Sequence, residues 1–132
     1  MEKWFLSFDS ILVLASDLPA KSALLDQLSE FLKSGILVTS SHSVQRCAEF
    51  FEHRGEKSFR SFYSRLRPAL DHVLEVTERD QSYALDLAES SNMSLGLALE
   101  AAVAIHSGAS GFVSSNSKID SLSELPRIAV AI

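Results

Sequence analysis

The chain alternates short, continuously apolar runs with longer segments in which apolar residues recur every three or four positions. Continuous apolar runs are typical of strands that are buried on both faces, and the longer spacing is typical of amphipathic helices. Strands that alternate with helices form a mainly parallel sheet covered on both faces. The sequence therefore predicts an α/β fold, a three-layer sandwich with a sheet of about five strands.

The expected elements follow directly from this pattern. Strands are expected over 4–8, 36–39, 74–76, 111–114 and 127–132. Helices are expected from Asp17 and Pro19 to about residue 33, then over 44–51, 57–68, 77–88 and 95–105. Thr77 and Asp80 have the spacing of a capping box, and the helix over 95–105 is apolar nearly all round, which indicates a buried central helix.

Composition limits the class of protein. With 132 residues, 46% hydrophobic and 22% charged, the chain is expected to form one globular domain over 1–132. A single cysteine, Cys47, allows neither a disulfide nor a cysteine-based zinc site and favours a reducing, cytoplasmic location. Asp9 and Asp17 interrupt the first apolar stretch, and Glu100 interrupts the most apolar helix, so neither a signal peptide nor a membrane span is expected. The sequence lacks a glycine-rich phosphate loop, so no nucleotide cofactor is expected.

Charge is unevenly distributed along the chain. The formal net charge is −5, which argues against general nucleic-acid binding, because affinity for phosphates comes from Lys and Arg. Half of the 12 basic residues nevertheless lie between residues 46 and 67: Arg46, Arg54, Lys57, Arg60, Arg65 and Arg67. We interpret this segment as a basic face for RNA or a partner protein, with a solvated helix surface as the alternative.

Polar residues follow two of the expected strands. Ligands bind beyond the carboxyl ends of parallel strands, so Asp9 should converge with Ser114, Ser115 and Asn116 at one edge. A carboxylate there suits a hard divalent cation, which generates a nucleophilic water for phosphodiester hydrolysis. One acid alone holds such a cation poorly, and Asp9 equally suits a helix-capping role.

Several stretches resemble the PIN-domain family, of the VapC-like toxin ribonuclease type. Residues 8–13, Phe-Asp-Ser-Ile-Leu-Val, are similar to the family's opening motif, and residues 83–88, 94–104, 108–109 and 112–116 resemble its C-terminal half. The resemblance implies a PIN-like fold and metal-dependent cleavage of single-stranded RNA with magnesium or manganese. It also implies an antitoxin-like protein or a second copy of the chain as partner.

The resemblance also shows where this chain departs from the family. Members surround their metal with four acids, and Asp9 matches the first of them. The other three positions fall at Gln45 or Glu49, at Leu97 and at Asn116. Leu97 cannot ligate a metal, and Asn116 offers only a neutral carbonyl oxygen. Glu100, one helical turn from Leu97, is a candidate replacement.

Two functions therefore remain open. An active endoribonuclease would use Asp9, Asn116 and Glu49 in catalysis, with Asp9 and Glu100 as ligands of Mg²⁺ or Mn²⁺. The alternative is a PIN-like pseudoenzyme without a cofactor that binds RNA or a protein. Its candidate contact residues are Arg46, Arg60, Arg65, Arg67, Ser114 and Ser115. The depleted acidic set favours lost or weakened catalysis.

Overall fold

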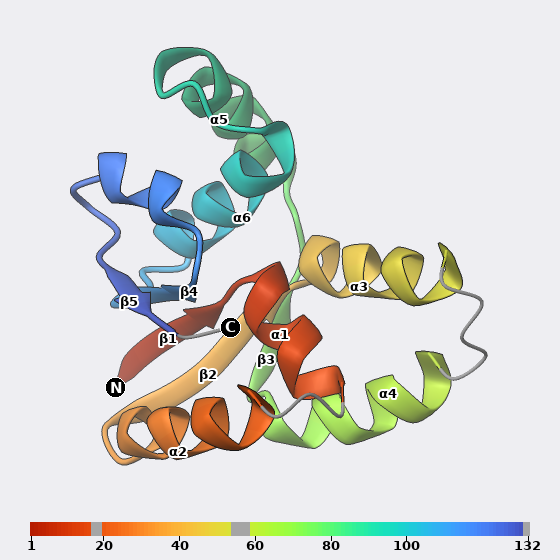
Figure 1. Ribbon diagram of the computed structural model, residues 1–132. Helices are drawn as coiled ribbons and strands as arrows, with labels where there is room; N and C mark the ends of the chain where they lie inside the picture. Colours follow the sequence, from red (N-terminus) through yellow and green to blue (C-terminus); the bar gives the residue numbers. More distant parts are fainter. Residues whose placement is uncertain (17–19, 54–58, 131–132) are drawn as a thin grey trace.

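The computed structural model describes residues 1–16, 20–53 and 59–130 (Figure 1). The described residues form one five-stranded sheet in the order β3-β2-β1-β4-β5, and every neighbouring pair is parallel. The strands are β1 (Glu2–Leu6), β2 (Gly35–Ser40), β3 (His72–Leu74), β4 (Gly111–Ser114) and β5 (Arg127–Ala129). The predicted α/β class with a parallel sheet is confirmed.

Helices cover both faces of this sheet (Figure 1). One face carries α1 (Phe8–Ala15), α2 (Ala20–Leu32), α3 (Ser41–His53) and α4 (Phe59–Leu66). The other carries α5 (Glu78–Ser90) and α6 (Leu95–His106), together with the short 3₁₀ helix η2 (Ser117–Ser121). A second 3₁₀ helix, η1 (Arg67–Ala69), follows α4 and contains the predicted stop at Pro68. The three layers expected from the sequence are therefore present.

Alternate strand residues point into two separate cores. Phe5 and Phe112 are fully buried under α5 and α6, with ring centroids 5.4 Å apart. The next residue of each strand, Leu6 and Val113, is buried in the core beneath α1 to α4. This is the packing that continuously apolar strands of a parallel sheet require.

The topology places a switch point beside β1. The chain passes from β1 to β2 and β3 on one side of it, then crosses to β4 and β5 on the other. The register pairs Phe5 with Phe112 and Leu6 with Val113, so β1 and β4 end at the same edge. Clefts for ligands form where the strand order reverses in this way.

The first strand ends earlier than the sequence indicated. It stops at Leu6 rather than at residue 8, because Ser7 takes the N-cap position with φ −72° and ψ 170°, and α1 begins at Phe8. The sequence did not separate α1 from this strand, since its apolar residues occur on nearly every side and give no helical period. Asp9 consequently lies in the first turn of a helix and not at a strand end.

Other strand and helix boundaries also differ from those expected from the sequence. The third strand occupies His72–Leu74 instead of 74–76, because Asp71 pairs with both the N–H and the C=O of Leu37 and fixes its register. Helix α3 starts at Ser41, directly after β2, where a serine-rich turn was expected. The expected helix start at Asp17 and Pro19, the first two residues of the helix expected over 57–68 and the last two residues of the final strand lie outside the described residues.

The helix caps agree with the sequence. The Thr77 amide donates to Asp80 Oδ2 at 2.9 Å, and the Asp80 amide donates to Thr77 Oγ1 at 3.1 Å, which completes the predicted capping box. After α6, Gly108 adopts φ 77°, a conformation that glycine allows without steric cost. No helix among the described residues has the length and apolar character needed to cross a membrane.

Candidate functional site

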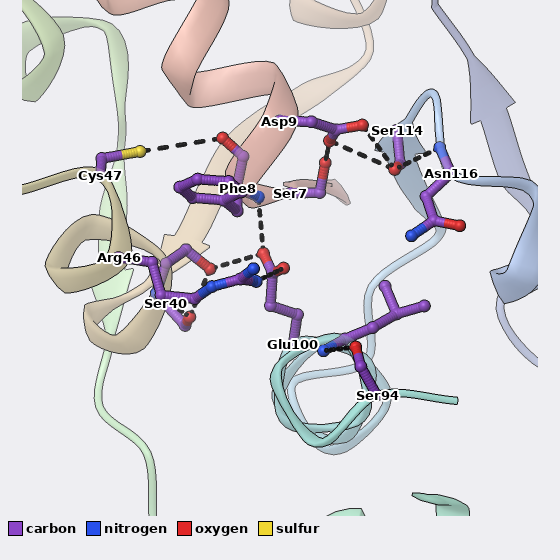
Figure 2. A network of polar contacts seen from close by, with 12 residues as sticks. Ser7, Phe8, Asp9, Ser40, Arg46, Cys47, Ser94, Glu100, Ser114 and Asn116 are labelled. Carbon is purple, nitrogen blue, oxygen red and sulfur yellow. Dashed lines mark hydrogen bonds and ion pairs between the residues drawn. The ribbon is translucent and has the colours of Figure 1, made fainter. Parts of the chain in front are cut away.

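Asp9 lies at the carboxyl edge of β1 and β4, where the sequence placed it (Figure 2). Its Oδ2 accepts hydrogen bonds from the Ser115 amide at 2.9 Å, from Ser115 Oγ at 2.6 Å and from Ser114 Oγ at 3.1 Å. Its Oδ1 accepts from the Ser10 amide at 2.9 Å and from the hydroxyl of Ser7. An ionised carboxylate has about four lone-pair positions, so protein donors occupy this one fully.

Glu100 reaches the same edge from α6, and its side chain is 2% exposed. Its Oε2 accepts from the Phe8 amide at 2.6 Å and from Ser43 Oγ at 2.7 Å. Its Oε1 lies 3.2 Å from Arg46 Nη1. Burial raises the pKa of Glu100 to about 7, while these hydrogen bonds and the charge of Arg46 oppose the shift.

Arg46 is the cationic side chain of this arrangement. Its guanidinium carbon lies 4.2 Å from the centroid of the Phe8 ring, which is a cation–π contact. On another side it lies against α6 at Gly96, where an added Cβ would be 3.2 Å from Nη1. The side chain is 35% exposed, so the guanidinium lies between the buried carboxylate of Glu100 and the solvent.

These residues enclose a small pocket of 90 Å³ (Figure 2). Its lining consists of Ser7, Phe8, Asp9, Arg46, Ser94, Leu97, Glu100, Ser114 and Asn116. The structure thus brings Asp9, Glu100 and Asn116 to one place. The carbonyl oxygen of Asn116 is engaged by the Lys118 amide at 3.1 Å, where it caps η2.

Glu49 does not join this group. It is exposed on α3, as is Gln45, and the two side chains face each other with Gln45 Nε2 3.4 Å from Glu49 Oε1. Residues four apart share a helix face, and the face toward the pocket carries Ser43 and Arg46 instead. Neither Gln45 nor Glu49, the candidates for the second acid of the PIN pattern, therefore reaches the pocket, and α3 presents the cation of Arg46 there instead.

The structure only partly supports the expected basic face, because one of its arginines does not lie on the exposed surface. Arg46 points into the pocket and pairs with Glu100. Arg60 is exposed on α4, and Arg67 is exposed while donating to the Leu70 carbonyl at 2.7 Å. Arg54, Lys57 and the side chain of Arg65 lie outside what the structure describes.

The donors around the pocket do not fit a divalent metal. Across residues 1–16, 20–53 and 59–130, no three His, Cys, Asp or Glu side chains are grouped so that they could hold one. Magnesium requires several free oxygen ligands in near-octahedral geometry. Here the oxygens of Asp9 and Glu100 already accept hydrogen bonds from the protein, and a guanidinium lies beside them.

Sequence reasoning placed Ser114 at this edge but missed the other buried serines of the site, Ser7, Ser40 and Ser43. Ser7 follows β1, while Ser40 and Ser114 end β2 and β4, and all three are buried at the carboxyl edge. Ser40 Oγ lies 2.7 Å from Ser43 Oγ, which in turn donates to Glu100. Serine at the end of each central strand was the available signal, because a polar residue closing a buried strand needs a partner.

A larger pocket of 470 Å³ lies beside β3, lined in part by Leu74, Arg79, Asp80 and His106. His106 Nδ1 is 2.5 Å from Asp80 Oδ1. Burial opposes ionisation of Asp80, but the Thr77 amide and His106 together hold its pKa below the ordinary value. This pair joins the end of α6 to the start of α5, and Asp80 is already used in the capping box.

Comparison with solved structures adds to this picture, although no family model and no curated protein matches the chain significantly. VapBC2 from Rickettsia felis, bound to a DNA fragment from its promoter, is 15% identical with a TM-score of 0.80 over 98% of this chain and 99% of that one. VapC20 from Mycobacterium tuberculosis, a toxin that cleaves the sarcin-ricin loop, is 15% identical with a TM-score of 0.74 over 91% and 95%. A toxin–antitoxin complex from Klebsiella pneumoniae is 9% identical with a TM-score of 0.67 over 92% and 93%.

This chain has the PIN fold of VapC toxins. The similarity spans nearly the whole length of each compared chain, so the predicted PIN-like architecture is confirmed. Structural similarity at sequence identities this low establishes only the fold, because activity depends on the particular residues of the site.

Proposed function

We propose that this PIN-fold protein is a noncatalytic binding module that acts through a protein partner of the antitoxin kind. The observation that carries the proposal is the state of the two pocket carboxylates. Protein donors engage both Asp9 and Glu100, and the cation beside them is Arg46. Metal-dependent hydrolysis needs free carboxylate oxygens that hold the ion and orient water, and this arrangement offers a closed polar network instead.

A protein partner is favoured over RNA because the Arg46 side chain points into the pocket. That residue neutralises Glu100 and no longer contributes to a phosphate-binding face. Leu95, half-exposed at the start of α6, lies next to Ser94 and thus beside the pocket. Apolar side chains of this kind form the centres of protein interfaces. The similar structure from Klebsiella pneumoniae is itself a toxin–antitoxin complex.

A cytoplasmic location fits this role. The chain has one cysteine, and its thiol is buried against the Phe8 carbonyl at 3.8 Å. Burial, followed by the charge of Glu100, raises the pKa of Cys47, so the thiol is unreactive. Nothing in this arrangement requires an oxidising compartment.

The second candidate is an active Mg²⁺- or Mn²⁺-dependent endoribonuclease that serves as the toxin of a toxin–antitoxin pair. It is favoured by one observation, that Asp9, Glu100 and Asn116 line the same pocket. In this case Arg46 would have to leave Glu100 before an ion could bind.

RNA cleavage distinguishes the two candidates. Purified protein and an identically prepared Asp9→Asn variant are incubated with generic single-stranded RNA in Mg²⁺ or Mn²⁺, with and without EDTA. We expect no cleavage above the level of the variant. Cleavage that disappears both in Asp9→Asn and with EDTA would establish the endoribonuclease and remove the noncatalytic proposal.

The protein partner is tested with the product of the gene adjacent to this one, co-expressed and measured for complex formation. We expect a complex that Leu95→Asp weakens and that Leu25→Asp, on a distant helix, leaves intact. Equal affinity for wild type and Leu95→Asp would place the interface elsewhere than beside the pocket.

A further inference from the structure

We infer that the guanidinium of Arg46 is the resident cation of the acidic pocket and stands where the PIN fold leads one to expect a divalent metal ion. The inference rests on the proposed noncatalytic function and deepens it, because it names what replaces the metal. Three kinds of observation carry it: the charge of the pocket, the seat of the guanidinium and the state of the oxygen donors.

The charge of the pocket requires a cation. Asp9 and Glu100 line the same 90 Å³ space, and burial, together with the charge of Asp9, raises the pKa of Glu100. A buried carboxylate is tolerated when a paired charge and hydrogen bonds compensate for its lost hydration. Among the described residues that line this pocket, Arg46 is the one cationic side chain, and its Nη1 is 3.2 Å from Glu100 Oε1.

The residues around the guanidinium also form a site that fits it. The ring of Phe8 lies 4.2 Å from its central carbon, and the backbone of Gly96 leaves the space that any Cβ would enter. Phe8 belongs to α1, Gly96 to α6 and Arg46 to α3, so three elements meet at the cation. A solvated arginine on a helix surface needs no such arrangement.

The oxygen donors complete the argument. Ser115 and Ser10 hold the Asp9 carboxylate with their backbone amides, and Ser43 and the Phe8 amide hold Oε2 of Glu100. A divalent ion would have to displace these donors and also approach the positive charge of Arg46. Removal of that charge leaves only the hydrogen-bond donors to compete with the ion, so it should make the pocket more responsive to a divalent cation.

The test measures Mn²⁺ binding by calorimetry and by the melting temperature, with no RNA present. Wild-type protein is expected to bind no Mn²⁺ in the pocket and to melt at the same temperature with and without it. Arg46→Gln keeps a polar side chain but removes the charge, and it should bind Mn²⁺ at least about tenfold more tightly than the detection limit that bounds the wild type. The gain should disappear in Arg46→Gln/Glu100→Gln. The matched control, Arg60→Gln on α4, should behave as wild type.

Two results would overturn the inference. One is Mn²⁺ binding by wild-type protein that Asp9→Asn abolishes, and the other is a folded Arg46→Gln protein that is indifferent to Mn²⁺. Should Arg46→Gln fail to fold, Arg46→Lys, which retains the charge, is measured with the wild type: both must ignore Mn²⁺, and a response from either refutes the inference. RNA cleavage by the wild type would refute the proposed function. If the wild type cleaves no RNA and folded Arg46→Gln does not respond to Mn²⁺, only this inference is refuted.

Discussion

The backbone amide of Phe8 donates a 2.6 Å hydrogen bond to the carboxylate of Glu100, 92 residues away. Phe8 is the first residue of α1, whose N-cap residue, Ser7, makes no side-chain capping bond. The first amides of a helix lack intrahelical partners and carry a partial positive charge, so a carboxylate stabilises them. Glu100, which belongs to α6 on the opposite face of the sheet, thereby caps α1. Asp9, in the first turn of α1 itself, accepts the hydrogen bond of the Ser10 amide.

Removal of the Glu100 carboxylate should therefore destabilise the protein. Glu100→Ala leaves the Phe8 amide and the Ser43 hydroxyl without their acceptor and Arg46 without its counter-ion. We expect a loss of about 3 kcal/mol in the free energy of unfolding, measured by urea denaturation. Glu89→Ala, an exposed glutamate on α5, is the control and should change stability by less than about 0.5 kcal/mol. Equal losses for the two variants would contradict the capping role.

Stability should also depend on pH through Glu100. Its pKa is 4.5 in the reference state and about 7 in the folded protein, so between these values the folded state retains a proton that the unfolded chain has released. Folding is then favoured at the acidic end, and stability falls as pH rises from 4.5 to 7, by up to about 1.4 kcal/mol per unit. Denaturation midpoints across this window should show that slope in wild type and a flatter one in Glu100→Gln. Identical slopes would refute the assignment.

Gly96 and Arg46 should be energetically coupled. Alanine favours a helix over glycine by about 1 kcal/mol, but here a Cβ would lie 3.2 Å from Arg46 Nη1. We expect Gly96→Ala to stabilise the Arg46→Ala protein more than it stabilises the wild type, by about 0.5 kcal/mol or more in a double-mutant cycle. Strict additivity of the two substitutions would show that the guanidinium does not rest against α6.

Asp9 should hold the segment after β4 in place. Its carboxylate accepts from both the amide and the hydroxyl of Ser115. In Asp9→Ala the Ser115 amide loses its acceptor, and its hydrogen exchange should accelerate by about tenfold, which corresponds to about 1.4 kcal/mol of local protection. Asp26→Ala on α2 serves as the matched control and should leave this amide unchanged. Unaltered exchange in Asp9→Ala would mean that other contacts order the segment.

Much of the architecture was predictable from local pattern. Apolar runs located all five strands and placed the first four to within two residues, because a strand buried on both faces leaves a continuous apolar signature. The last strand was expected over 127–132 but ends at Ala129. Thr77 and Asp80 correctly predicted the start of α5, since a capping box involves only residues three apart. Helix α1 escaped prediction, because its first amides are capped by a side chain from α6 and its apolar residues show no single face.

By itself the sequence determined the α/β class, the place of Asp9 beside Ser114 and Ser115, and the absence of acids at Leu97 and Asn116. Only the tertiary structure decided that Arg46 turns inward to Glu100 while Gln45 and Glu49 turn outward. The reason is physical: residue spacing sets which side chains share a helix face, but the rotation of α3 against α6 depends on packing. That rotation brings together Arg46 and Glu100, which are 54 positions apart, and forms an internal ion pair.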